Sequence, residues 1–270
     1  MLIDTHCHLD VTEFDGRREA VLDAARAAGV GAFVVPAVGA ENFAAVRALS
    51  AAHADVRHAY GIHPLFVTRA READLEVLAE RLGEGTAVAV GEIGLDHYVA
   101  DVDPDTQRHY FVEQLKLARR FGLPVILHVR RAVDAILKEL RRIEVPGGIA
   151  HAFNGSRQQA DIFRAMGFRL GFGGAATFSG STRIRRLVAE LPLESIVLET
   201  DSPDIRPEWA QDRPNEPANL PRIAAVIARL RGIGVDELAA ATATNAQAVL
   251  PRLEHAGDGI MHGQHSGREA

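Results

Sequence analysis

The sequence predicts a single-domain α/β protein, a (β/α)8 TIM barrel. Eight short runs of β-branched and apolar residues recur along the chain, and each is followed by a stretch with helical spacing. The length of 270 residues lies near the roughly 250 residues typical of this barrel. A doubly wound open sheet is the other candidate, but the chain has no early G-x-G-x-x-G and no P-loop to support it.

The expected elements alternate in order. The apolar runs that predict strands cover residues 2–6, 31–38, 57–63, 87–93, 124–129, 148–153, 168–173 and 196–201. The stretches that predict helices cover residues 17–28, 40–52, 72–82, 105–121, 132–142, 157–166, 182–190 and 220–230. Helix ends are expected at Gly29, Gly122 and Gly167, and helix starts at Asp103-Pro104 and Ser156. No low-complexity linker divides the chain, so we expect one domain over residues 1–253, followed by a disordered tail over residues 254–270.

Composition limits the function and the location. The formal net charge is −6, with 36 acidic and 30 basic residues, which does not suit a protein that coats nucleic acid by bulk charge. No apolar run approaches the roughly 18 residues of a membrane-spanning helix, so we expect no membrane partner. The single cysteine, Cys7, allows no internal disulfide and fits a reducing compartment. We therefore expect a cytoplasmic protein without a removable leader, because a candidate ligand pair already begins at position 6.

His6 and His8 form that pair. Side chains two residues apart on a strand point to the same face, so both imidazoles could bind one metal ion. Two ordinary histidines near a surface terminus are the alternative. Cys7, between them, is expected to point away and to pack rather than to bind metal.

Further ligand-type side chains end four other predicted strands. They are Glu92, His128, His151 and Asp201. Each alone has a simpler explanation, such as a core histidine, a turn cap or a loop carboxylate. Together with His6 and His8 they converge on the C-terminal end of the predicted barrel, where barrel enzymes carry their chemistry. Burial of so many ionisable groups is costly unless their charges are compensated, so the set predicts a metal site.

Six motifs carry a resemblance to the TatD family of metal-dependent deoxyribonucleases, in the amidohydrolase superfamily. The likeness runs in order from about residue 1 to 253. The motifs are His6-x-His8, Gly61-Ile62-His63-Pro64, Gly91-Glu92-Ile93-Gly94-Leu95-Asp96, His128-x-Arg130, His151-Ala152-Phe153 and Glu199-Thr200-Asp201-Ser202-Pro203. The resemblance implies a (β/α)8 barrel, hydrolysis of phosphodiester bonds in DNA, and ligand roles for His6, His8, Glu92, His128, His151 and Asp201.

By analogy with the superfamily, two divalent cations (Mg, Mn or Zn) are expected. Glu92 would bridge them, His6 and His8 would hold one, and His128 and His151 the other. Asp201 is expected to bind the first cation and to orient or deprotonate the attacking water.

Three more residues receive roles around these ligands. His63 is expected to act on a substrate phosphate or leaving oxygen, and Arg130 to hold a phosphate. Asp96 is expected to orient a ligand histidine. Glu199 lies two residues before Asp201 and should therefore point into the barrel as well. The residue that it contacts is left open. Arg183, Arg185 and Arg186 are interpreted as a solvated helix face, with a DNA track as the alternative.

Three functions are compatible with these residues. The first is a nuclease acting on DNA ends, with single strands favoured and the protein a monomer. The second is a hydrolase of small molecules, esters or aminoacyl-tRNA on the same barrel. The third, a non-catalytic binding protein, is disfavoured because all six ligand types are present. The chain departs from the family at Asp204, His97-Tyr98 and Arg213-Pro214-Asn215, all on expected loops over the site, which leaves the substrate open.

Overall fold

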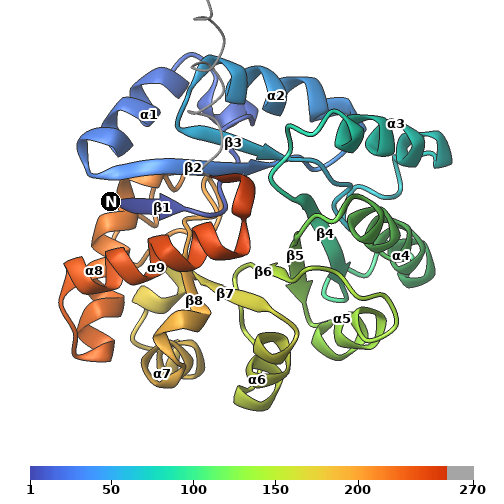
Figure 1. Ribbon diagram of the computed structural model, residues 1–270. Helices are drawn as coiled ribbons and strands as arrows, with labels where there is room; N and C mark the ends of the chain where they lie inside the picture. Colours follow the sequence, from blue (N-terminus) through green and yellow to red (C-terminus); the bar gives the residue numbers. More distant parts are fainter. Residues whose placement is uncertain (254–270) are drawn as a thin grey trace, which may run out of the picture.

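A computed structural model describes residues 1–253 and forms a barrel of eight parallel strands surrounded by helices (Figure 1). The predicted (β/α)8 fold is confirmed. The strands are β1 Leu2–Asp4, β2 Val30–Pro36, β3 Val56–Ala59, β4 Val90–Asp96, β5 Val125–Arg130, β6 Gly148–Ala150, β7 Phe168–Phe172 and β8 Ile196–Leu198. The helices are α1 Arg18–Ala27, α2 Phe43–Ala52, α3 Glu72–Gly83, α4 Pro104–Phe121, α5 Val133–Leu140, α6 Arg157–Ala165, α7 Thr182–Glu190, α8 Leu220–Arg231 and α9 Val235–Val249.

Two strand ladders close into one ring. Strands β1, β2 and β3 form one ladder and β4 to β8 the other. At the β3–β4 seam, the backbone nitrogen of Gly91 donates to the carbonyl of Tyr60 at 2.9 Å. At the β8–β1 seam, the nitrogen of Thr5 donates to the carbonyl of Leu198 at 3.0 Å. Backbone pairing therefore continues around the barrel and brings the C-terminal strand ends to one rim.

Helix caps lie where the sequence predicts them. Asp103 accepts a hydrogen bond from the nitrogen of Thr106 at 2.8 Å at the start of α4, and Gly122 ends that helix at a φ of 62°. This is the left-handed conformation that glycine adopts without a steric penalty. Ser156 caps α6 through the nitrogen of Gln159.

Helix α9 was not predicted. Its sequence is rich in Ala and Thr, so the apolar stripe that would reveal a helix has little contrast. The C-terminal half of α9 and the turn after it cover the N-terminal end of the barrel. Ala246, Val249 and Leu250 pack there on an inward layer of strand residues, Ile3, Val34, Ile126, Ile149 and Val197. This apolar plug closes the barrel opposite the expected site.

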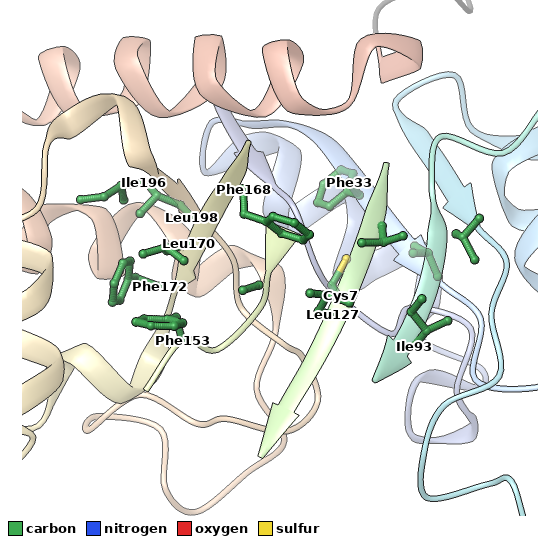
Figure 2. Close-up of a cluster of buried hydrophobic side chains, with 14 of the residues drawn as sticks. Cys7, Phe33, Ile93, Leu127, Phe153, Phe168, Leu170, Phe172, Ile196 and Leu198 are labelled. Atoms are coloured by element: carbon green, nitrogen blue, oxygen red, sulfur yellow. The ribbon is translucent and has the colours of Figure 1, made fainter. Parts of the chain in front are cut away.

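A second apolar layer fills the space between the strands and the outer helices. Figure 2 shows part of it, with Phe33, Leu127, Phe168 and Leu198 among the labelled residues. Cys7 lies in this layer, fully buried, with its sulfur 3.7 Å from the carbonyl oxygen of Val34. The prediction that Cys7 packs outward from the barrel axis therefore agrees with the structure.

Six strands, β1, β2, β3, β6, β7 and β8, end one to four residues earlier than predicted. Strand β1 ends at Asp4, β3 at Ala59, β6 at Ala150 and β8 at Leu198. Four predicted site residues therefore lie on the segments that follow these strands: His6, His63, His151 and Asp201. Strand alternation also fails before His6, because Ile3 and His6 are three residues apart and both face the barrel interior. The apolar runs continue past the last paired strand residues because the segments that follow are also buried. From the sequence alone, a buried loop segment of this kind cannot be distinguished from a strand.

None of the helices in residues 1–253 is long and apolar enough to cross a membrane.

Acid should destabilise the fold through His58, a buried residue of β3. Its ring packs 4.7 Å from the ring of Tyr60, and burial lowers its pKa from 6.5 to about 4. Because the folded pKa lies below the unfolded one, this contribution to stability is complete above pH 6.5 and is lost as the pH falls toward 4. We expect His58→Leu to reduce the loss of unfolding free energy between pH 7.5 and 5 by about 2 kcal/mol.

Urea unfolding at the two pH values measures this difference. His97→Leu, at an exposed histidine, is the control and should behave as the wild type. An equal pH dependence in all three proteins would contradict the assignment to His58.

Candidate metal centre

All six predicted ligands converge at the C-terminal rim of the barrel. Five of them line one cavity of about 1090 Å³, and His6 lies fully buried beneath it. His63 and Arg130 line the same cavity. The structure thus brings together the ligand set and both predicted substrate contacts.

Glu92, in β4, lies at the centre of the histidines. Its side chain is buried, and its two oxygens face opposite groups. Oε2 lies 3.1 Å from Nε2 of His6 and 3.5 Å from Nε2 of His8. Oε1 lies 3.0 Å from Nδ1 of His128 and 3.2 Å from Nε2 of His151. A carboxylate placed in this way can bridge two cations.

The first group consists of His6, His8 and Asp201. The Nε2 atoms of the two histidines are 3.2 Å apart, and Oδ1 of Asp201 lies 3.5 Å from His6 and 3.6 Å from His8. One ligand atom from each of the three residues lies within 4.8 Å of the others. Two imidazole nitrogens and a carboxylate aimed at one point suit a divalent cation.

The second group consists of His128 and His151, each with a carboxylate behind it. Asp96 Oδ2 lies 2.9 Å from Nε2 of His128, so that nitrogen carries the hydrogen, and Nδ1, 3.0 Å from Glu92 Oε1, would present its lone pair to a cation bound there. Glu199 Oε1 lies 3.4 Å from Nδ1 of His151, whose Nε2 faces Glu92. Outer carboxylates of this kind fix the tautomer of a metal-binding histidine and make it a better ligand.

Glu199 is the functional residue whose partner the sequence left open. Besides facing His151, its Oε1 accepts a hydrogen bond from the nitrogen of Ala152 at 2.5 Å. Gly171 on β7 makes room for this side chain, because a Cβ there would lie 2.1 Å from Glu199 Oε2. The position of Glu199 two residues before Asp201 was the available signal, but its partner His151, directly after β6, depends on how the strands pair.

His63 is placed as a hydrogen-bond donor. Its Nδ1 accepts from the backbone nitrogen of Leu65 at 3.1 Å, so in the neutral ring Nε2 carries the hydrogen. Burial lowers the pKa of His63, which favours that neutral ring. Nε2 lies 3.1 Å from Nδ1 of His128 and 3.5 Å from Glu92 Oε1, and the ring lines the cavity. In this tautomer Nε2 has a hydrogen to donate to a substrate atom, and only the other tautomer could join Glu92 and His128 around a cation.

A buried polar network holds Asp201 in place. Asp4 accepts hydrogen bonds from the nitrogen and the hydroxyl of Thr200, at 3.0 and 2.6 Å. Asn215 donates to the carbonyls of Thr200 at 2.8 Å and Ile205 at 3.1 Å. Asp201 itself has a left-handed backbone with a φ of 51°, which these contacts on either side support.

Burial and mutual contact shift the pKa values in the centre. Burial lowers the pKa of His6 to about 3, so its ring is neutral, and raises the pKa of Asp201 to about 6. Burial would raise the pKa of Glu92, but the surrounding histidines hold it well below its usual range. Burial opposes the charge on His8, yet contact with Glu92 and the charge of Asp201 raise its pKa to about 9. A bound cation would replace the proton on His8.

A (β/α)8 barrel with four histidines and two carboxylates gathered at this rim has the architecture of a metal-dependent hydrolase. A model of the TatD related DNase family matches residues 3–251. The metal-dependent hydrolase YjjV of Escherichia coli (strain K12) is 44% identical over 246 residues, which cover 90% of this chain and 95% of that relative. Its crystal structure matches with a TM-score of 0.90 over 93% of this chain and 98% of that chain, at 42% identity.

A further relative is the 3′-5′ ssDNA/RNA exonuclease TatD of Erwinia amylovora (strain ATCC 49946 / CCPPB 0273 / Ea273 / 27-3). It is 33% identical over 259 residues, covering 92% of this chain and 99% of that relative. The chain therefore belongs to the TatD related DNase family and is a metal-dependent hydrolase.

Replacement of Glu92 by glutamine should remove bound metal from the whole centre. The amide keeps the shape of the side chain but loses the charge that compensates the cations, so both sites should weaken together. Metal analysis after dialysis measures this, with thermal unfolding to show that the barrel remains folded. A Glu92→Gln protein that retained full metal content would contradict the central role of this carboxylate.

Asp96 and Glu199 should have milder effects, because each acts through a histidine. We expect Asp96→Ala and Glu199→Ala each to weaken metal affinity by about 10- to 100-fold, in the range measured for such outer residues. Competition with a chromogenic chelator gives the affinities. Glu144→Gln, at an exposed carboxylate, is the control; unchanged affinity in both alanine variants would exclude the orienting role.

Proposed function

We propose that this protein hydrolyses phosphodiester bonds at the ends of single-stranded DNA, using two divalent cations (Mg, Mn or Zn). The observation that carries the proposal is a set of three arginines, Arg130, Arg131 and Arg183, in the wall of the cavity that contains Glu92 and Asp201. A phosphodiester is an anion, and arginine binds phosphate through two parallel hydrogen bonds.

We expect one cation in each group. His6, His8, Asp201 and Oε2 of Glu92 would hold one, and His128, His151 and Oε1 of Glu92 the other. When bound, such a pair lowers the pKa of water and neutralises charge on the attacking and leaving oxygens.

The protein side chains then supply orientation and proton transfer. Asp201 faces the cavity, and burial raises its pKa to about 6, close to the range in which a carboxylate serves as a general base at neutral pH. His63 can donate its Nε2 hydrogen to a phosphate oxygen or to the leaving oxygen. Arg130 lies over the ring of Tyr98 at 3.9 Å, which holds its guanidinium at the cavity wall.

The shape and charge of the molecule favour a short flexible end over a long duplex. The site lies in a cavity, and the net charge is −6, so a broad duplex footprint would meet repulsion. The Erwinia relative bears the name of an exonuclease that acts on single-stranded DNA and RNA. This name supports the same substrate class for the present chain.

One observation favours hydrolysis of a small molecule, an ester or an aminoacyl-tRNA as the second candidate. Val11, Val38, Leu65 and Phe66 form an apolar part of the same cavity, which suits an uncharged group. A neutral ester would gain little from Arg130, so the two functions differ in their dependence on that residue.

Arg130→Ala should therefore raise KM for a single-stranded oligonucleotide by about tenfold, as expected for one lost phosphate contact. Metal content and turnover of a small neutral ester should stay unchanged. Arg229→Ala, at an exposed arginine of α8, is the control, and chelator-treated wild type is the blank. If no divalent metal supports cleavage of DNA while the neutral ester is turned over rapidly, the second candidate is the correct one.

A further inference from the structure

The rim of the cavity carries two walls of opposite charge. The cationic wall consists of Arg130 at the end of β5, Arg131 directly after it, and Arg183 in the first turn of α7. The acidic wall consists of Glu13 and Asp204, from the segments after β1 and β8, next to His8 and Asp201. The first metal group lies on the side of the acidic wall, and His128 of the second group lies on β5 with Arg130.

The cationic wall includes an aromatic stack. Arg131 has a left-handed backbone with a φ of 54°, and this turn lets two consecutive arginines reach one ring. Their guanidinium groups lie 3.9 and 4.6 Å from the ring centre of Tyr98, which is 51% exposed. A half-exposed stack of planar cationic groups on a ring suits a single strand, whose bases stack on such groups and whose phosphates pair with the cations.

Arg183 completes the cationic wall. Its Nε and Nη2 donate to Oδ1 of Asn154 at 3.0 and 2.7 Å, which holds the guanidinium at the cavity and leaves Nη1 available. Within residues 1–253, neither Arg131 nor Arg183 forms an ion pair, and Arg130 has only Asp96 at 3.9 Å. Many other arginines are paired more closely, as Arg26 is with Asp55 at 2.7 Å. Arg183 is exposed on α7, as the interpretation of a solvated helix face expects, and it also lines the cavity.

The acidic wall is likewise uncompensated. Among the described residues, neither Glu13 nor Asp204 is in an ion pair, and both are exposed side chains that line the cavity. A phosphate group beside them would be repelled, whereas a neutral hydroxyl would not.

We propose that these two walls orient the substrate. The charged backbone of the strand extends from the metal centre over the cationic wall and Tyr98, and the terminal nucleoside lies over the acidic wall with a free hydroxyl. A phosphate on that terminus is rejected. This inference rests on the proposed function, because it assigns the direction and the end group of the same oligonucleotide.

A binding experiment tests the orientation separately from hydrolysis. The probes are internally labelled oligothymidylates with phosphorothioate terminal linkages, carrying hydroxyls at both ends, a 5′-phosphate or a 3′-phosphate. Fluorescence anisotropy with the metal-loaded protein gives the affinities. We expect one of the two terminal phosphates to weaken binding by about tenfold, corresponding to about 1.4 kcal/mol, and the other to leave binding unchanged or stronger.

Matched variants identify the two walls. Glu13→Gln combined with Asp204→Asn should abolish the discrimination between ends, whereas Asp212→Asn, on the same β8 loop but outside the cavity, should retain it. Arg131→Ala and Arg183→Ala should weaken all three probes by about the same factor. Arg186→Ala, one turn further along α7, should not.

Several outcomes would overturn the inference: equal affinity for all three probes, discrimination that survives the double variant, or no binding to any probe. Cleavage of unmodified strands is measured in parallel. If the probes bind with the expected pattern but unmodified strands are not cleaved with any divalent metal, the proposed function fails and the orientation of the bound strand stands.

Discussion

The contact of Glu92 with the surrounding histidines is the interaction on which the site depends. Three ligand histidines are buried and His128 is partly buried around this carboxylate, and positive charge on them would be costly without it. The backbone places Glu92 there by close approach of neighbouring strands. A Cβ on Gly61 would lie 2.6 Å from the backbone of Gly91, so only a glycine allows this distance. The nitrogen of Glu92 also donates to the carbonyl of Ala37 at 3.0 Å.

The barrel separates this chemistry from the packing that stabilises it. At the N-terminal end, α9 and the turn after it cover an apolar layer that includes Ile3, Ile126 and Ile149. At the other end, His128 and His151 stand two residues beyond Ile126 and Ile149 and continue the same inward face. In each of these two segments, a buried isoleucine is thus followed two residues later by a candidate metal ligand. Packing of the isoleucine in the apolar layer fixes the position of that ligand.

Much of this arrangement could be predicted from the sequence. The eight strand-helix units follow from alternation, and the convergence of His6, Glu92, His128, His151 and Asp201 follows from barrel topology. The sequence did not reveal α9, whose Ala-rich composition has little amphipathic contrast. It also could not supply the partner of Glu199 or the position of Arg183, because both depend on contacts between elements distant in sequence. The early ends of β1, β3, β6 and β8 escaped prediction, because buried loops keep the composition of strands.

The buried contacts around Thr200 have a consequence for how this family can diversify. Asp4 and Asn215 fix the backbone on either side of Asp201 from below the rim, whereas Asp204 lies only three residues further on and is exposed. The residues on both sides of Asp204 are also held, because the carbonyl of Pro203 accepts from the backbone nitrogen of Asn215 at 2.9 Å and that of Ile205 from its side chain at 3.1 Å. Only the side chain of Asp204 is free, so a substitution at position 204 can change what faces the cavity without moving the backbone that holds Asp201.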